Sequence, residues 1–311
     1  MAQVASAMAR ASGAPPAGEV WIGDDAAVLG APGGPLLLAT DAAVAGVHAD
    51  LSLVGLDDLG WKALTATVSD IGAMGGRPLH AVVSLCLPPG TDVGSLAAGI
   101  AEASARWSCP VVGGDVTGAD QVVVSVAATG VVEGDGPPVT RSGASPGDRL
   151  LVTGPLGRSA AGLRFLRATA RSGGRGAGDE VGEALVAAHR RPLARIAEGI
   201  TARRAGATAM IDVSDGLAID LHRLADASRV GFHLETVPVA GGASEAEALA
   251  GGEDYELVIA VPDDRVAALE AAFVAAGLRA PFIVGRCATD PSERLLAGSP
   301  LPRSGWQHRL G

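Results

Sequence analysis

The sequence predicts an α/β or α+β protein with two domains. Strand-like apolar runs alternate with helical patterns in both halves of the chain, as is typical of these fold classes. At roughly 150 residues per domain, a chain of 311 residues has the length of two domains. Residues 133–147 (EGDGPPVTRSGASPG) are dense in Gly, Pro and Ser, as a linker is. We therefore expect one domain at 1–136 and another at 137–311.

In the first half, strands are predicted from short apolar or β-branched runs, and helices from apolar residues that recur every three or four positions after a capping residue. The expected strands are 36–38, 81–87 and 121–132. The expected helices are one capped by Asp57 or Asp58, with Trp61, Leu64, Val68 and Ile71 on its apolar face, and one from Thr91 towards Trp107.

The second half repeats this alternation of strands and helices. Its expected strands are 149–153, 209–213, 231–237, 255–261 and 282–284. Its expected helices begin at about Gly157, after Pro192, at Asp215 and at Asp264. The helix from Asp215 carries Leu217, Leu221 and Leu224 on one face. The glycine-rich stretch 172–178 is expected to be a mobile loop.

Composition excludes several classes of protein. The chain is 48% hydrophobic and 19% charged, which is not the composition of a disordered chain. A net charge of −10 argues against a general nucleic-acid-binding role, which needs a basic surface. Three widely spaced cysteines favour a reducing compartment. No apolar run approaches the ~20 residues of a membrane span, and the first residues do not resemble a secretory signal. We expect a soluble, cytoplasmic protein that binds neither nucleic acid nor membrane.

Lys62 is the sole lysine, so the chain contains no G-x-x-x-x-G-K-[ST] loop, and any nucleotide is held without a P-loop. We expect Lys62 itself on a solvated helix face. The sequence also lacks G-x-S-x-G, H-E-x-x-H and C-x-x-C.

The informative feature is where the aspartates stand. In a chain poor in charge, they follow apolar runs and adjoin Gly, Ser or Thr. They are Asp24-Asp25, Asp41, Asp70, Asp115, Asp212 and Asp215. Any one of them alone is usually a turn residue or a helix cap, because a buried carboxylate needs a partner. If all of them converge, their charge must be neutralised by arginine, lysine or metal ions.

Magnesium suits such a set, because Mg²⁺ prefers oxygen ligands and is bound by a few carboxylates together with substrate phosphates. Zinc fits badly, since no Cys or His ligands accompany the acids. Glycines at Gly113-Gly114, Gly143 and Gly154 would let backbone N–H groups approach a phosphate, and Arg141 could clamp one. The sequence thus predicts magnesium-dependent phosphoryl chemistry.

The chain resembles the thiamine-monophosphate kinases, of the superfamily that includes AIR synthetase, selenophosphate synthetase and a hydrogenase maturation factor. The resemblance runs from Gly23 to Trp306 and rests on an ordered set of motifs. They are GDDAAVL, TDAAVAGVH, WKALTATVSDIGAMGGRP, GGDVTG, TRSGASPGD, VTGPLGRSAAGL, IDVSDGLAIDL and GGEDYEL.

The resemblance implies transfer of the ATP γ-phosphate directly to thiamine monophosphate, without a covalent enzyme intermediate. It implies an N-terminal mixed-sheet domain that binds ATP and metal and pairs in a homodimer, followed by a C-terminal α/β domain. The implied Mg²⁺ ligands are Asp25, Thr40, Asp41, Asp70, Asp115, Asp212 and Asp215. The implied ATP contacts are Gly114, Asp115, Arg141 and Ser214, and the implied thiamine-phosphate contacts are His48, Glu253 and Trp306.

Several alternatives stay open. His48 could be a surface or core residue, Glu253 a turn residue and Trp306 an anchor for the C-terminal tail. Ala39 and Ala49 depart from the family's usual residues. The chain could be another ATP-dependent enzyme of the superfamily, or a non-catalytic sensor of nucleotide or thiamine phosphate.

Overall fold

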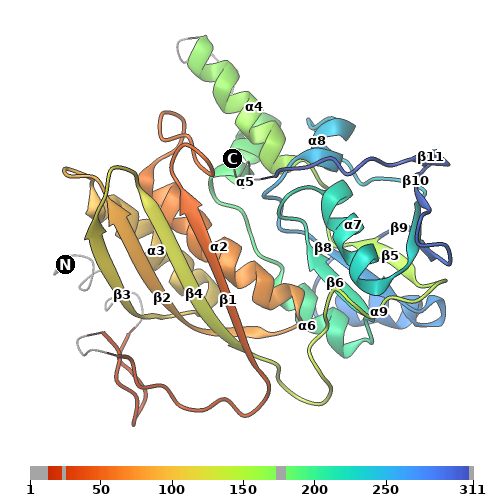
Figure 1. Cartoon of the computed structure of the whole chain (residues 1–311), viewed down its shortest axis with the longest axis horizontal. Coiled ribbons are helices and arrows are strands. Elements are labelled where there is room, and N and C mark those ends of the chain that lie inside the picture. Colours follow the sequence, from red (N-terminus) through yellow and green to blue (C-terminus); the bar gives the residue numbers. More distant parts are fainter. Residues whose placement is uncertain (1–12, 23–25, 173–179, 308–311) are drawn as a thin grey trace. The chain divides into compact units, whose positions relative to one another are not determined.

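A computed structural model describes residues 13–22, 26–172 and 180–307 (Figure 1). The metal ligand expected at Asp25 and most of the loop expected at 172–178 lie outside these residues. The described chain divides into two compact units. The first comprises the described residues up to Ile71 together with Gly76–Gly136, and the second comprises Gly72–Gly75 together with the residues from Pro137 onwards. Within the described residues, no helix is long and apolar enough to cross a membrane.

The first unit is built on a four-stranded mixed sheet. Its strand order is β1 (Leu36–Val44), β4 (Val123–Val131), β2 (Arg77–Leu87) and β3 (Val111–Gly118). Neighbouring strands are antiparallel except β2 and β3, which are parallel. The helices α2 (Leu56–Ala73) and α3 (Val93–Trp107) cover one face of the sheet (Figure 1). They approach it closely, because a side chain at Gly130 of β4 would meet Ile71 of α2 at 2.5 Å.

The other face of this sheet is partly covered by the described residues, since Glu19 and Trp21 contact His80 of β2 on it, and we call it the open face. Because side chains alternate between the two faces of a strand, Leu36 and Leu38 of β1 share this face, and Val82 of β2 lies on it as well. These three side chains are 57%, 74% and 42% exposed. Leu37, between the first two, points to the helices and is buried. The open face therefore presents apolar side chains to solvent.

The second unit is built on a seven-stranded mixed sheet. The strand order is β11 (Ser299–Pro300), β10 (Arg294–Leu296), β7 (Gly231–Leu234), β9 (Phe282–Ala288), β5 (Arg149–Val152), β8 (Leu257–Val261) and β6 (Ala209–Asp212). Its helices are α4 (Arg158–Arg171), α5 (Glu180–Arg190), α6 (Ile196–Arg204), α7 (Leu217–Ser228), α8 (Glu245–Ala250) and α9 (Val266–Ala275), with a short 3₁₀ turn at Asp263–Arg265.

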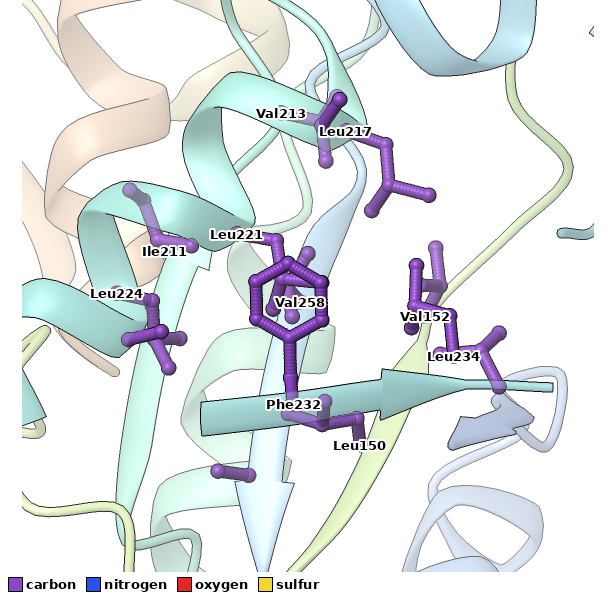
Figure 2. Packing of buried hydrophobic residues seen from close by; sticks show 14 of the residues in the cluster. Leu150, Val152, Ile211, Val213, Leu217, Leu221, Leu224, Phe232, Leu234 and Val258 are labelled. Atoms are coloured by element: carbon purple, nitrogen blue, oxygen red, sulfur yellow. The ribbon is translucent and has the colours of Figure 1, made fainter. Parts of the chain in front are cut away.

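One core of this unit lies between α7 and the sheet (Figure 2). Leu217, Leu221 and Leu224 of α7 meet Phe232 of β7 and Val258 of β8, and all five side chains are buried. The three leucines recur at helical spacing, so the face predicted from the sequence is the one that packs. This packing fixes the start of α7 against the end of β6, where the candidate site begins.

Several expected elements need correction. The strand expected at 36–38 extends to Val44, and the one expected at 255–261 begins at Leu257. Asp92, not Thr91, caps α3, since its side chain accepts from Ser95 N. Gly216, not Asp215, is the residue that precedes α7. Lys62, expected in solvent, is buried in α2. The elements β3, α5, α8, β10 and β11 were not expected from the sequence.

Candidate active site

The loop between β6 and α7 carries the two expected site residues Ser214 and Asp215. Its shape is set by Asp220 in the first turns of α7. One oxygen of this carboxylate, Oδ2, accepts from the backbone N–H groups of Ser214 (3.1 Å), Asp215 (2.9 Å) and Gly216 (3.2 Å). Burial raises the pKa of Asp220 to about 6, although the backbone N–H donors favour the charged form. The loop is therefore folded around a buried acid that the sequence analysis did not single out.

Arg223, one turn further along α7, joins this acid to Asp215. Its Nη1 donates to Asp215 Oδ2 at 2.5 Å and to Asp220 Oδ1 at 2.6 Å. Asp212, the last residue of β6, is 2% exposed and lies three residues before Asp215. Two of the expected metal ligands thus stand at the end of one strand, and an arginine already balances part of their charge.

The acidic turn 253–256 lies against this loop. Glu253 N donates to Ser214 O at 2.8 Å, and Tyr255 N donates to Val213 O at 2.9 Å. Glu253 and Tyr255 both have a positive φ, +67° and +50°, a backbone conformation that residues other than glycine rarely adopt. Such strain persists only where the surroundings hold it, and it concentrates at functional sites.

Asp254, between the two strained residues, ties the turn to the first turn of α4. Its Oδ2 accepts from Gly157 N at 2.5 Å, and its Oδ1 accepts from Ser159 N at 3.0 Å. Burial raises the pKa of Asp254 to about 6, even though these two N–H groups favour its charged form. The carboxylate satisfies backbone donors at the start of α4 that the helix itself leaves without partners.

Glu256 holds the other end of the turn. Its side chain is 1% exposed and accepts from Arg195 Nε at 2.9 Å, Arg195 Nη2 at 2.6 Å and Thr153 Oγ1 at 2.6 Å. A side chain at Gly154 would begin 2.4 Å from Glu256 Oε1. The structure thus uses the missing side chain of Gly154 to seat this carboxylate, whereas the sequence suggested a place for phosphate.

Trp306 arrives from the C-terminal segment. Its backbone N donates to Asp215 O at 2.9 Å, and its side chain is 47% exposed. Three segments that are distant in sequence therefore meet in the second unit. We call them the three-segment cluster, which consists of Ser214–Asp215, Glu253 and Trp306. Four of the residues expected at the site belong to it.

In the first unit, the expected residues fall on both faces of the sheet. Asp41 lies opposite Val126, on the face where Leu37 is buried, whereas Asp115 lies opposite Ser84, on the open face. Adjacent residues of a strand point to opposite faces, so Thr40 and Asp41 also diverge. Thr117 Oγ1 donates to Asp115 Oδ2 at 3.1 Å, and Thr40 Oγ1 donates to Val126 O at 3.0 Å.

The other expected residues lie outside these strands. His48 follows β1, and its Nδ1 accepts from Val44 N at 3.0 Å. Asp70 is near the end of α2 and partly exposed, while Arg141 is exposed before β5. Gly114 of β3 approaches Val83 O so closely that a side chain would begin 2.0 Å from it. Among the described residues, no group of three or more His, Cys, Asp or Glu side chains could hold a metal ion.

Sequence reasoning missed the residues that shape this site. They are Asp220, Arg223, Asp254, Glu256, Arg195, Ser159 and His189. A signal existed for the acids, since a charged residue inside an apolar run such as LAIDL or DYELVIA needs a partner once buried. The partners of Asp220 lie within six residues of it, whereas those of Asp254 and Glu256 are distant in the chain, so no local signal named them.

Comparison with known proteins places this chain in a family. Residues 23–132 match the model of the AIR synthase related protein N-terminal domain, and residues 145–297 match that of the C-terminal domain. Thiamine-monophosphate kinase of Corynebacterium glutamicum is 36% identical over 262 residues, covering 78% of this chain and 77% of the relative. The one of Mycobacterium tuberculosis is 36% identical over 295 residues, covering 92% and 84%.

Solved structures of thiamine-monophosphate kinases also match this chain. The crystal structure of thiamine-monophosphate kinase from Stenotrophomonas maltophilia superposes with a TM-score of 0.80 and 30% identity, over 89% of this chain and 90% of that one. A structure described as AaThiL complexed with AMPPCP and TMP superposes with a TM-score of 0.76 and 31% identity, over 88% and 87%. Hydrogenase maturation protein HypE of E. coli, 22% identical with a TM-score of 0.72, shares the fold.

Proposed function

The chain belongs to the thiamine-monophosphate kinase family of AIR synthase related proteins, and from that premise we propose that it transfers the γ-phosphate of ATP to thiamine monophosphate. The products are thiamine diphosphate and ADP. The observation that carries the proposal is the similarity to a relative solved with an ATP analogue and TMP, together with the three-segment cluster in this chain. The enzyme is an ATP-dependent phosphotransferase whose acceptor is a phosphate group.

The three-segment cluster supports a thiamine-phosphate site. Glu253 supplies a carboxylate that is 25% exposed, and Trp306 supplies a half-exposed indole. A cationic thiazolium ring is attracted both to a carboxylate and to the face of an aromatic ring. His48, in the first unit, is the other expected contact of thiamine phosphate. Because its Nδ1 accepts a hydrogen bond from Val44 N, the neutral ring carries its proton on Nε2.

ATP is expected to contact Gly114, Asp115, Arg141 and Ser214. Gly114 brings bare backbone to the surface of β3, and the exposed Arg141 presents a guanidinium fork that matches phosphate oxygens. Ser214 lies on the loop folded around Asp220, so its position is fixed before a nucleotide arrives. No side chain serves as a covalent nucleophile, since the acceptor is a phosphate oxygen of the substrate.

We expect Mg²⁺ to be held by Asp25, Thr40, Asp41, Asp70, Asp115, Asp212 and Asp215. The donor set fits this ion, because every donor is a carboxylate or hydroxyl oxygen and none is sulfur or imidazole. The metal, when bound, offsets the negative charge of the transferred phosphoryl group. Arg223 keeps the Asp215 carboxylate at the end of β6, where it is oriented before any ion binds.

We also propose a cytoplasmic homodimer in which strands of the first unit pair with those of a second copy, with the open sheet face at the interface. Leu36, Leu38 and Val82 expose apolar surface there. Leu38→Glu should shift the protein from dimer to monomer in light scattering. Val274→Glu, which changes a 65% exposed valine on α9, is the matched control and should leave the mass unchanged. A dimeric Leu38→Glu variant contradicts this interface.

The test of the function is an assay with ATP, Mg²⁺ and thiamine monophosphate that measures thiamine diphosphate. We expect the diphosphate to form from the monophosphate, and none to form from free thiamine. Thermal stabilisation by ATP and Mg²⁺ without any product would refute phosphoryl transfer to thiamine monophosphate.

A further inference from the structure

We propose that Ser159 and His189 are positioning residues that orient the carboxylate of Glu253 towards thiamine monophosphate. The inference rests on the proposed function, in which Glu253 contacts that substrate. Ser159 lies in the first turn of α4, and His189 lies in the last turn of α5. Neither residue was expected at the site from the sequence.

The three side chains form a short chain of contacts. Ser159 Oγ lies 3.0 Å from His189 Nδ1 and 3.4 Å from Glu253 Oε2, while His189 Nδ1 lies 3.7 Å from the same oxygen. Ser159 is 2% exposed and His189 is 4% exposed, whereas Glu253 reaches solvent. Two buried polar groups thus stand behind a carboxylate whose front remains accessible.

The hydrogen-bond directions follow from chemistry. An ionised carboxylate can only accept, so the single hydroxyl proton of Ser159 points to Glu253. The hydroxyl oxygen is then left to accept, and His189 donates to it from Nδ1. This order fixes the tautomer of the imidazole ring and limits the rotation of the Glu253 side chain.

The close approach of α4 and α5 creates the contact. A side chain at Gly162 of α4 would begin 2.1 Å from Leu185 O and 2.9 Å from His189 Cβ, so only glycine lets the helices lie this near. Ser159 also gives its backbone N–H to Asp254 Oδ1. One residue therefore holds Asp254 by its backbone and Glu253 by its side chain, and both acids belong to the strained turn.

A hydrolytic role for serine, histidine and glutamate does not fit this geometry. In a catalytic triad, the histidine stands between serine and acid and uses both ring nitrogens. Here the serine stands in the middle, and the same ring nitrogen faces both partners. The hydroxyl is also buried and directed at a carboxylate, so it is not presented to a substrate. The arrangement orients Glu253 and provides no nucleophile.

Steady-state kinetics of Ser159→Ala tests the proposal. Without the Ser159 hydroxyl, Glu253 is no longer held towards the substrate, so we expect the KM for thiamine monophosphate to rise about tenfold, the scale of one hydrogen bond to a charged group, while the KM for ATP stays within about twofold. Ser104→Ala is the matched control. Ser104 is an equally buried helical serine, and its Oγ has no hydrogen-bond partner among the described residues. It should leave both constants unchanged.

Two substitutions of the histidine provide a second measurement if Ser159→Ala does not fold. His189→Asn keeps an N–H donor near the Nδ1 position and should retain most of the affinity for thiamine monophosphate. His189→Gln moves the donor outwards and should raise that KM as Ser159→Ala does. A purely structural loss at His189 would instead change the KM for ATP together with that for thiamine monophosphate.

The outcomes separate the two proposals. A wild-type enzyme that does not phosphorylate thiamine monophosphate refutes the proposed function. An active wild type whose Ser159→Ala variant keeps its KM for thiamine monophosphate, or raises both KM values equally, refutes the positioning role. Equal constants for His189→Asn and His189→Gln refute it as well.

Discussion

Replacing Arg195 by methionine should lower the free energy of unfolding by about 3 kcal/mol. Removing one partner of a buried ion pair typically costs about 3–5 kcal/mol, because the other charge is left without compensation. Glu256 would lose both donors of Arg195, at 2.9 and 2.6 Å, in a place where its side chain is 1% exposed. Thr153 Oγ1 remains at 2.6 Å and Arg158 lies 4.0 Å away, so we expect the lower end of the range.

The pKa of Arg195 supports a strongly coupled pair. Burial favours the neutral guanidine, yet the charge and hydrogen bonds of Glu256 outweigh it and raise the pKa of Arg195 above its usual range. The pair also leads to a prediction for a double variant. Arg195→Met/Glu256→Met removes both charges, so it should be more stable than Arg195→Met alone.

Urea unfolding of these variants, followed by far-ultraviolet circular dichroism, measures the effect. Arg77→Met is the matched control, because Arg77 and Glu133 form an ion pair at 2.7 Å with both side chains nearly half exposed. An exposed pair is worth about 0–1 kcal/mol. An Arg195→Met variant that loses no more unfolding free energy than Arg77→Met refutes this prediction. So does a double variant whose loss equals the sum of the losses of Arg195→Met and Glu256→Met.

Three further predictions follow from the site. Asp70→Asn should keep the fold and reduce kcat at least about 100-fold, since it removes charge where we place the metal; turnover within a few-fold of wild type contradicts that placement. Trp306→Ala should raise the KM for thiamine monophosphate more than that for ATP, and equal changes would place the indole outside the substrate site. Burial raises the pKa of Asp254 from 3.8 to about 6, so the folded state favours the protonated acid and loses stability as the pH rises from 4 to 6. Asp254→Asn removes this loss. Urea unfolding from pH 4 to 6 should show the variant gaining up to about 3 kcal/mol of unfolding free energy relative to wild type. Parallel plots of unfolding free energy against pH for the two proteins would show that Asp254 does not titrate there.

The elements that could be predicted are those whose pattern is local. The apolar spacing of α2 and the β-branched run of β4 each carry enough signal within one segment. The strand β3 carries none, because VVGGDVTG contains two adjacent glycines and an aspartate, residues that strands disfavour. It forms a strand because β2 supplies a parallel partner along its length. Tertiary pairing thus overrides local preference here.

The site residues likewise divide into those with a local sequence pattern and those without one. Reading acids at the ends of apolar runs led to Asp212, the last residue of β6, and to Asp215, three residues later. The same reading passed over Asp220, which lies inside a helical pattern and looks like one polar residue on an amphipathic face. Besides Arg223, its partners are three backbone N–H groups of a loop, and these gather only after the loop has folded. Sequence patterns locate charges, but the fold decides what neutralises them.

Neutralisation by the fold bears on how many of the acids need a metal ion. If the expected aspartates converge, arginine, lysine or metal ions must neutralise their charge, and a chain with a single lysine favours metal ions. In the second unit, however, Glu256 is neutralised by Arg195, Asp215 is shared with Arg223, and Asp254 and Asp220 are held by backbone N–H groups. Four of the acids near the three-segment cluster are therefore part of the scaffold or already paired. Of these four acids, only Asp215 is an expected metal ligand, and Arg223 donates to its Oδ2. The buried acids Asp220, Asp254 and Glu256 need no metal ion, because the fold itself supplies their hydrogen-bond donors.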